Sequence, residues 1–274
     1  MIGIIGQGFV GNAVYQKFKN HYTVYTYDKF KSDYTSTLDE LVKKSKYIFL
    51  CLPTPMNTDG SCNTDIIESV LEEINDLLVE DKIIVIKSTI VPKTTVRLNE
   101  KYDRLHIVFN PEFLTERNAV EDYNKQDRII LGGDRPYTTE LKQIFTKVFP
   151  NAHIIKTDST HAEMVKYLTN TFLSVKVSFA NEIYELCGKL GIDYDKVVEY
   201  ATMDNRLGHS HWSVPGPDGH LGFGGHCFPK DLAALIRLSF ELNTTNNVLC
   251  ATQSTNDDIR SFKDWELMKG RAIV

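Results

Sequence analysis

The sequence lacks any long hydrophobic run, and none approaches the roughly 18–20 apolar residues that a membrane-spanning helix needs. Its first residues lack the basic segment and cleavage site of a secretory signal. Cysteines are few, and their spacing (51, 62, 187, 227, 250) forms neither a CxxC pair nor a disulfide framework. Basic residues are in deficit, 31 against 36 acidic ones, whereas a nucleic-acid binder is usually basic. We therefore expect a reduced, cytoplasmic protein that binds neither membrane nor nucleic acid.

The chain does contain enough apolar residues for a core, at 42% of 274 residues, a length that favours two domains. In the first half, short apolar runs alternate with helical patterns such as 65–78 and 138–149. Continuous apolar runs are typical of strands buried on both faces of a parallel sheet. The alternation predicts a Rossmann-like, doubly wound parallel sheet of the α/β class. The expected strands are 1–5, 22–28, 47–52, 82–87, 105–109 and 128–131.

A long helix dominates the second half. Between 160 and 187 there is no proline or glycine, and apolar residues recur every three or four positions. The members of this stripe are Met164, Leu168, Phe172, Val175, Phe179, Ile183 and Leu186. Further helices are expected at 193–203, 229–242 and 246–262, with a long loop at 204–228. We predict an NAD-binding domain over 1–157 and an all-helical domain with a long central helix over 158–274.

Gly6, Gly8 and Gly11 follow the first expected strand and open the first helix. This spacing permits a tight turn, close approach to a pyrophosphate and close packing of helix on strand. Asp28 ends the second expected strand, where a carboxylate can accept a hydrogen bond from a ribose 2′-hydroxyl. The pattern predicts a dinucleotide site that favours NAD over NADP. Lys29 lies close by and moderates that preference.

Cys227 lies in GFGGHCFPKD at 222–231. Pro229 suits the first turn of a helix, so Cys227 is expected just before a helix N-terminus, which stabilises a thiolate. Asp231 follows closely enough to share the site. A buried, inert cysteine in a glycine-rich turn is the alternative that this stretch alone leaves open.

Other polar residues occupy positions where ligands bind in open α/β sheets, after the carboxyl ends of strands. They are Thr54 with Pro55, Ser88 with Thr89, and Glu112 with Glu116. Lys166 and Asn170 are four residues apart on the long helix and share one of its faces. Each of these could also be a turn, a helix cap or a solvated helix residue.

Taken together, the motifs resemble the UDP-glucose/GDP-mannose dehydrogenase family. The matching segments are GQGFVG, the Asp28 strand end, PTP, STIVP, NPEFLTE, Glu163-x-x-Lys166-x-x-x-Asn170, DNRLG and GFGGHCFPKD, in that order. The resemblance implies a Cys227 nucleophile, with Lys166, Asn170, Asp231, Thr89, Glu112 and Glu116 as its catalytic neighbours. It implies NAD contacts from Gly6, Gly8, Phe9, Val10, Gly11, Asp28, Lys29, Thr54, Pro55, Thr89 and Glu116. It implies substrate contacts from Phe113, Leu114, Arg206, Phe223 and Gly224.

The implied reaction is an NAD-dependent four-electron oxidation of a nucleotide sugar, UDP-glucose to UDP-glucuronate, through a Cys227 thiohemiacetal and thioester. A two-electron 3-hydroxyacid-type dehydrogenase and a non-catalytic binding subunit are the alternatives. Arg206 matches an arginine that the family offers across a dimer interface, so a homodimer is expected. The histidines around Cys227 match no zinc motif, and we expect no metal.

Three features depart from the family pattern. The sequence reaches Val274 without the residues of the third, nucleotide-binding domain that family members usually have. His226 stands where the glucose-type enzymes usually have another residue, and Arg117 replaces a common glycine. The identity of the sugar and of the nucleotide is therefore left open.

Overall fold

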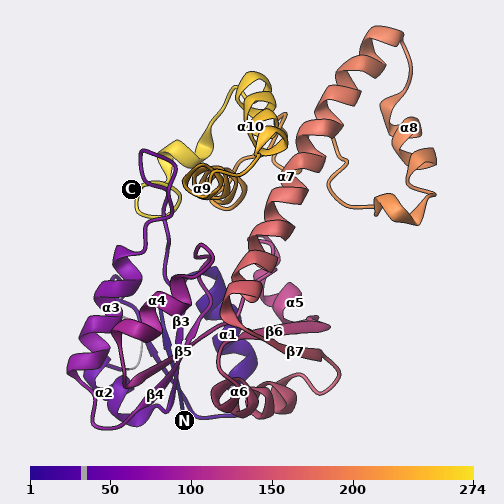
Figure 1. Cartoon of the computed structure of the whole chain (residues 1–274). Helices are drawn as coiled ribbons and strands as arrows, with labels where there is room; N and C mark the ends of the chain where they lie inside the picture. The colour runs from indigo at the N-terminus through magenta and orange to yellow at the C-terminus, as the bar shows by residue number, and fades with distance from the viewer. Residues whose placement is uncertain (32–35) are drawn as a thin grey trace. The chain divides into compact units, whose positions relative to one another are not determined.

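The computed structural model describes residues 1–31 and 36–274, and in this part of the chain seven strands form one sheet in the order β2-β1-β3-β4-β5-β6-β7. Figure 1 shows this sheet with helices on both sides. The strands are β1 (Ile2–Ile5), β2 (Val24–Tyr27), β3 (Tyr47–Leu50), β4 (Lys82–Ile86), β5 (Leu105–Phe109), β6 (Arg128–Gly132) and β7 (His153–Thr157). All six expected strands are present, and the predicted α/β class is confirmed.

Two strands, β6 and β7, run in the opposite direction to the other five, against the prediction of a parallel sheet. β6 pairs antiparallel with β5, whereas β6 and β7 are parallel. The connection between β5 and β6 therefore re-enters the sheet at the edge where β5 ends, instead of crossing to the opposite edge. Side chains of this connection hold it there, since Asn110 donates from Nδ2 to the carbonyl oxygen of Ile130 at 2.7 Å.

Ten α-helices of the described chain cover the sheet and build the second half. In the first half they are α1 (Phe9–Phe18), α2 (Leu38–Lys44), α3 (Asp65–Asp76), α4 (Thr94–Lys101), α5 (Ala119–Asn124) and α6 (Arg135–Val148). The long helix α7 runs over Ser159–Leu190, close to the predicted span. It is followed by α8 (Tyr194–Ala201), α9 (Phe228–Glu241) and α10 (Asn247–Ile259). Two short 3₁₀ turns, η1 (Asn205–Leu207) and η2 (Asp264–Leu267), lie before and after α9 and α10.

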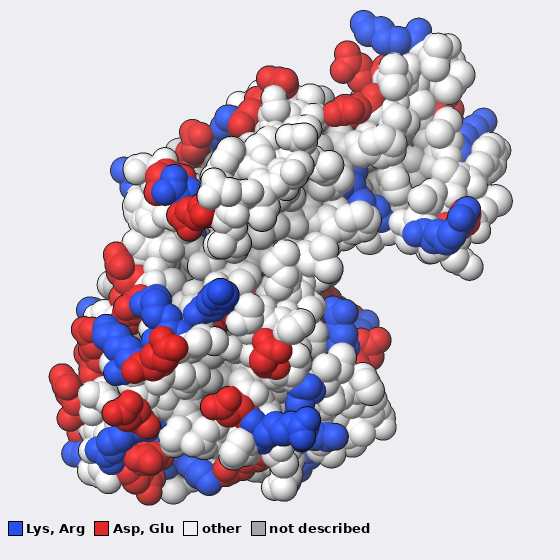
Figure 2. Space-filling view, viewed as in Figure 1, with Lys and Arg blue, Asp and Glu red and all other residues white. Residues whose placement is uncertain are grey.

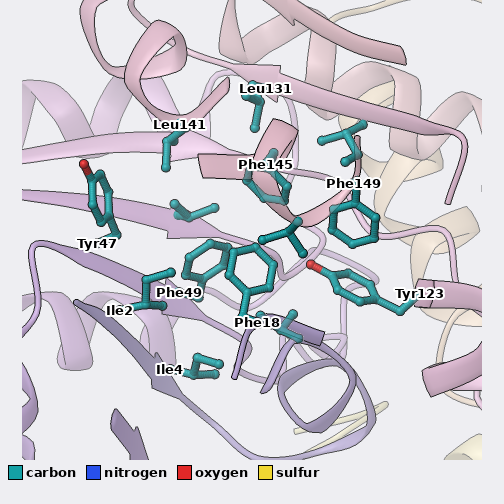
Figure 3. Packing of buried hydrophobic residues seen from close by; sticks show 14 of the residues in the cluster. Ile2, Ile4, Phe18, Tyr47, Phe49, Tyr123, Leu131, Leu141, Phe145 and Phe149 are labelled. Atoms are coloured by element: carbon teal, nitrogen blue, oxygen red, sulfur yellow. The ribbon is translucent and has the colours of Figure 1, made fainter. Parts of the chain in front are cut away.

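The sheet has a separate hydrophobic core on each face. Ile83 and Val85 of β4 pack into one core, whereas Ile84 and Ile86 pack into the other, as the alternation of a strand requires. Figure 3 shows the first core, in which the Phe18 ring meets that of Phe49 with centroids 5.2 Å apart. Burial on both faces explains why these strands are continuous apolar runs in the sequence.

The described chain forms two compact units. The α/β unit comprises Met1–Thr54 and Thr64–Lys166, and the helical unit comprises Pro55–Asn63 and Tyr167–Val274. The change of unit falls inside α7, and a short segment from the first half belongs to the helical unit. The predicted functional domains over 1–157 and 158–274 stay a prediction.

Each helix of the described residues is too short or too polar to span a bilayer. On the face drawn in Figure 2, basic and acidic side chains are interspersed over the α/β unit. The net charge of −5 is thus not gathered into one acidic surface on that face.

Candidate active site

The glycine turn at the start of α1 is built for close packing on one side and open approach on the other. Gly6 has a φ of +86°, and a Cβ on Gly11 would lie 1.9 Å from the Gly6 carbonyl oxygen. A Cβ on Gly8 would meet nothing within 4 Å. Gly8 is also the N-cap of α1 and offers no side chain to its free N–H groups. Phe9 and Val10 form the first turn of that helix, so the predicted GxGxxG residues lie together where an anion can bind.

Asp28 is held beside this turn. Its carboxylate accepts hydrogen bonds from the backbone N–H groups of Gln7 at 2.7 Å and Phe30 at 3.0 Å. Lys31 donates to the Gln7 carbonyl oxygen at 2.7 Å. A pocket of about 630 Å³ opens here, lined by Tyr27, Asp28, Lys29, Phe30, Lys31, Ser36, Thr37 and Leu38. The fixed carboxylate suits the ribose of a dinucleotide, and the adjacent helix N-terminus, which no side chain caps, suits its pyrophosphate.

Side chains join the ends of β3 and β4. Thr54 donates from its hydroxyl to the Thr89 carbonyl oxygen at 2.8 Å, and the Leu52 N–H donates to the Ser88 hydroxyl at 3.0 Å. Pro55 follows directly but belongs to the helical unit. The structure thus brings Thr54 and Thr89 together at the sheet edge where β3 and β4 end.

A buried ion pair lies at the same edge, and sequence reasoning missed half of it. Lys87 and Glu112 are 3% and 5% exposed, and Lys87 Nζ lies 2.9 Å from Glu112 Oε2. Lys87 also donates to Asn110 Oδ1 at 2.8 Å, and Glu112 Oε1 accepts from the Phe113 N–H at 2.9 Å. These contacts hold the Glu112 carboxylate in place. The only sequence signal was a lysine at the end of an otherwise apolar strand.

Lys166 joins this cluster from α7. Its buried ammonium donates to the Glu112 carbonyl oxygen and lies 5.3 Å from the centroid of the Phe113 ring. Glu112 therefore pairs with Lys87 through its carboxylate and accepts a hydrogen bond from Lys166 through its backbone carbonyl oxygen. Leu114 lies next to this cluster in the chain and is half-buried, whereas Glu116 and Arg117 are exposed.

Glu163, in the same helix motif as Lys166, performs a different task. Its carboxylate accepts from the N–H groups of Lys93 at 2.7 Å and Thr95 at 2.8 Å, at the start of α4. Burial raises the pKa of Glu163, and the hydrogen bonds from the helix start oppose that rise. This residue ties α7 to the loop that follows Thr89.

Cys227 is exposed and is the N-cap residue of α9, as the sequence predicted. Loss of solvent around the sulfur raises the pKa of Cys227, but the neighbouring His226 and the charge of Lys230 lower it below the ordinary thiol value. Asp231 opposes that effect. A thiol in this position ionises more readily than a free cysteine.

Asp231 is almost fully buried behind Cys227 and is shared by two donors. Asn170 donates to it from Nδ2 at 2.6 Å, and Lys230 donates from Nζ at 2.6 Å. Burial lowers the pKa of Lys230 and the Asp231 charge raises it, with a net rise. The structure thus groups Asn170 and Asp231 as predicted and adds Lys230, which the motif contained but to which we assigned no role.

The glycine-rich loop before Cys227 is firmly held. Asn256 accepts from the Phe223 N–H at 2.7 Å and donates to the Phe223 carbonyl oxygen at 3.1 Å. The Gly225 N–H donates to Asp264 at 3.0 Å, and a Cβ on Gly224 would lie 2.2 Å from Asp264 Oδ1. Asn256 and Asp264 carried no sequence signal, because they act from far along the chain.

Arg206 stands apart from these groups in η1. Its side chain is 88% exposed and binds the carboxylate of Asp204. Within the described residues, no group of three or more His, Cys, Asp or Glu side chains is arranged to hold a metal ion.

Comparison with known proteins shows which family the chain resembles. Residues 24–151 match the NAD-binding domain of the UDP-glucose/GDP-mannose dehydrogenase family, and residues 160–258 match its central domain. The UDP-glucose 6-dehydrogenase AglM of Haloferax volcanii is 36% identical over 81% of this chain and 54% of its own length. This chain spans about half the length of the curated relatives that it matches first.

Solved structures agree with this placement. A UDP-glucose dehydrogenase from Pyrobaculum islandicum superposes with a TM-score of 0.83 at 27% identity, over 94% of this chain and 68% of that one. A UDP-D-ManNAc dehydrogenase from Pyrococcus horikoshii gives a TM-score of 0.80 with the same coverage at 19% identity, which shows the shared fold alone. The chain carries the NAD-binding and central domains of the UDP-glucose/GDP-mannose dehydrogenase family and belongs to that family.

Proposed function

We propose that this chain catalyses the NAD-dependent four-electron oxidation of a nucleotide sugar, UDP-glucose to UDP-glucuronate, with Cys227 as the nucleophile. The observation that carries the proposal is the exposed Cys227 thiol at the start of α9, with a lowered pKa, in a chain with the family's NAD-binding domain. The overall balance is one primary alcohol, two NAD and one water giving one carboxylate, two NADH and three protons. The five free cysteines suit the cytoplasm, where thiols stay reduced.

Gly6, Gly8 and Gly11 would bind the pyrophosphate with Phe9 and Val10 at the N-terminus of α1, while Asp28 would accept from the ribose hydroxyls and Lys29 would flank them. Thr54, Pro55, Thr89 and Glu116 would contact the nicotinamide half. When bound, NAD accepts a hydride in each of the two oxidation steps. The first of these steps oxidises the primary alcohol of the sugar to an aldehyde, with which Cys227 then reacts.

Cys227 acts as a thiolate. Its sulfur attacks the aldehyde carbon and forms a C–S bond, and the carbonyl oxygen takes a proton to give a thiohemiacetal. Loss of hydride from that carbon and of the hydroxyl proton leaves a thioester. Water then attacks the thioester carbon, the C–S bond breaks, and the thiolate is regenerated with the acid.

Lys166 and Asn170 would stabilise the oxyanion that develops in these steps, where one donor contributes about 3–4 kcal/mol. Asn170 is oriented by Asp231, and Lys166 by the Glu112 carbonyl oxygen. The proton of the alcohol passes either to Lys166 or to a water held by Asp231 and Thr89.

Hydrolysis would use Glu112, with Thr89 and Glu116 positioning the water. The ion pair with Lys87 supports this role, because it holds the Glu112 carboxylate in one position. Phe113, Leu114, Phe223 and Gly224 would line the sugar site.

Arg206 would reach the substrate of a second subunit, so we propose a homodimer. The apolar stripe of α7 supports this, because Leu168, Phe172 and Phe179 are 60%, 60% and 52% exposed. Contiguous exposed apolar side chains mark interaction surfaces. An active monomer in light scattering would refute the dimer.

The test is a count of NADH. Limiting amounts of UDP- and GDP-sugars are incubated separately with excess NAD and the purified chain. We expect two NADH for each UDP-glucose and the acid as product. One NADH would favour a two-electron, 3-hydroxyacid-type dehydrogenase, and none with any sugar would favour a non-catalytic binding subunit.

A further inference from the structure

Lys176 is a buried cation in the middle of α7 that the proposed mechanism does not use. It is only 8% exposed, and burial lowers its pKa. In the part of the chain that the structure describes, it has no carboxylate partner, in contrast to Lys87 and Lys230. A buried lysine without a counter-charge is costly, so its remaining contacts indicate why this position carries one.

Those contacts lead to one turn. Lys176 Nζ donates at 3.0 Å to the carbonyl oxygen of Leu207, the last residue of η1. The same ammonium lies 4.8 Å from the centroid of the Trp212 ring. Trp212 in turn donates from Nε1 to the Gly208 carbonyl oxygen at 2.9 Å. Two consecutive backbone carbonyls are therefore each held by a side chain.

Two residues of this turn have left-handed backbone conformations. Gly208 has a φ of +62°, and a Cβ built on it would lie 3.9 Å from Lys176 Nζ. His211, with a φ of +68°, is partly buried nearby, and burial and the Lys176 charge lower its pKa. A neutral imidazole beside the ammonium avoids a second buried positive charge.

The residue that this turn displays is Arg206. Its backbone N–H and its guanidinium both donate to Asp204, at 3.0 Å and 2.9 Å, while the side chain stays exposed. Asp204 thus directs the side chain, and Lys176 and Trp212 fix the backbone beneath it. An exposed arginine on a fixed turn loses little conformational freedom when it binds an anion.

We propose that Lys176 is a positioning residue for Arg206: it holds the η1 turn so that the Arg206 guanidinium is pre-set for an anionic group of the nucleotide sugar. The inference rests on the proposed function of Arg206 and adds the residue on which that function depends. Trp212 contributes the second hydrogen bond of the same support.

The first test reads the turn without any substrate. Trypsin cleaves after Arg206, and loss of one hydrogen bond should make local opening of the turn roughly fivefold more frequent. Lys176→Met should therefore be cut after Arg206 about fivefold faster than wild type, and Lys176→Arg at nearly the wild-type rate. The control is Lys189→Met, an exposed lysine on the same helix, which should leave the rate unchanged. Equal cleavage of Lys176→Met and wild type would overturn the inference whatever the enzyme does.

The second test reads substrate binding. Arg206→Ala and Lys176→Met should each raise KM for the nucleotide sugar about tenfold or more, with kcat within about threefold of wild type. The double variant should be no worse than Arg206→Ala alone, because both act through one contact. The positioning role would be refuted if the KM of the double variant rose by the product of the two single increases. It would also be refuted if Lys176→Met kept the wild-type KM while Arg206→Ala raised it. An ordinary KM in Arg206→Ala would refute the role of Arg206 together with this inference, whereas wild type that forms no NADH contradicts the proposed function alone.

Discussion

Cys51 and Cys227 lie one in each unit and show how position decides the chemistry of the same side chain. Cys51 follows β3 at the buried sheet edge, where burial raises the pKa of its thiol to about 12. Cys227 caps α9, is exposed, and has a pKa below the ordinary thiol value because His226 and Lys230 favour the thiolate. A thiol at a strand end packs as a small apolar group, whereas a thiol at a helix start can react.

The two units also differ in how completely they bury their apolar side chains. The α/β unit buries its apolar side chains in two large cores, one on each face of the sheet. The helical unit has smaller clusters and leaves Leu168, Phe172 and Leu186 of α7 more than half exposed. The first unit therefore buries most of its large apolar side chains, and the second leaves an apolar face of α7 exposed.

Removing half of the buried ion pair should have the largest effect on the scaffold. Lys87→Met leaves the Glu112 carboxylate buried without its partner, and we expect a loss of about 3–5 kcal/mol in the free energy of unfolding. Urea denaturation followed by circular dichroism measures this loss. The double variant Lys87→Met/Glu112→Gln should recover much of it, because no charge is then stranded.

Lys125→Met is the matched control, since Lys125 forms an exposed ion pair with Glu121, and it should not move the midpoint. If Lys87→Met were as stable as this control, the buried pair would not support the sheet edge.

Two glycines allow the scaffold and ligand roles of the α1 turn to be separated. Gly11→Ala places a Cβ 1.9 Å from the Gly6 carbonyl oxygen and should destabilise the α/β unit by about 1–3 kcal/mol. Gly8→Ala enters open space and should fold normally, yet bind NADH more weakly, because the methyl group blocks close approach of the pyrophosphate. Thermal melts and calorimetric NADH titrations test both. Unchanged NADH affinity in Gly8→Ala would place the pyrophosphate elsewhere.

The smallest effect is a shift in thiol reactivity with pH. Iodoacetamide reacts with the thiolate, so labelling of Cys227 should reach half its maximum at a lower pH than labelling of an ordinary cysteine. Cys51 should stay unlabelled across the neutral range. Peptide mass spectrometry resolves the two sites. In His226→Gln the Cys227 midpoint should rise, and equal labelling of Cys51 and Cys227 at neutral pH would remove the contrast between them.

The sequence predicted what depends on local order. The strands, α7, the glycine turn and the placement of Cys227 before a helix each follow from short-range periodicity or from a motif. Lys87, Asn256 and Asp264 were missed because their partners lie far away in the chain, and no spacing rule connects them. The reversed direction of β6 and β7 was missed for the same reason, since β6 is held by a side-chain hydrogen bond from the connection that precedes it.

The most direct test of the thioester mechanism is to isolate the covalent intermediate. Enzyme mixed with UDP-glucose and NAD is quenched in acid within one turnover and digested, and the peptide that contains Cys227 is weighed. We predict the added mass of the uronyl group on that peptide, more of it in Glu112→Gln, and neither adduct nor acid in Cys227→Ser. Acid formed at the normal rate by Cys227→Ser, or two NADH per sugar without any adduct, would contradict the account.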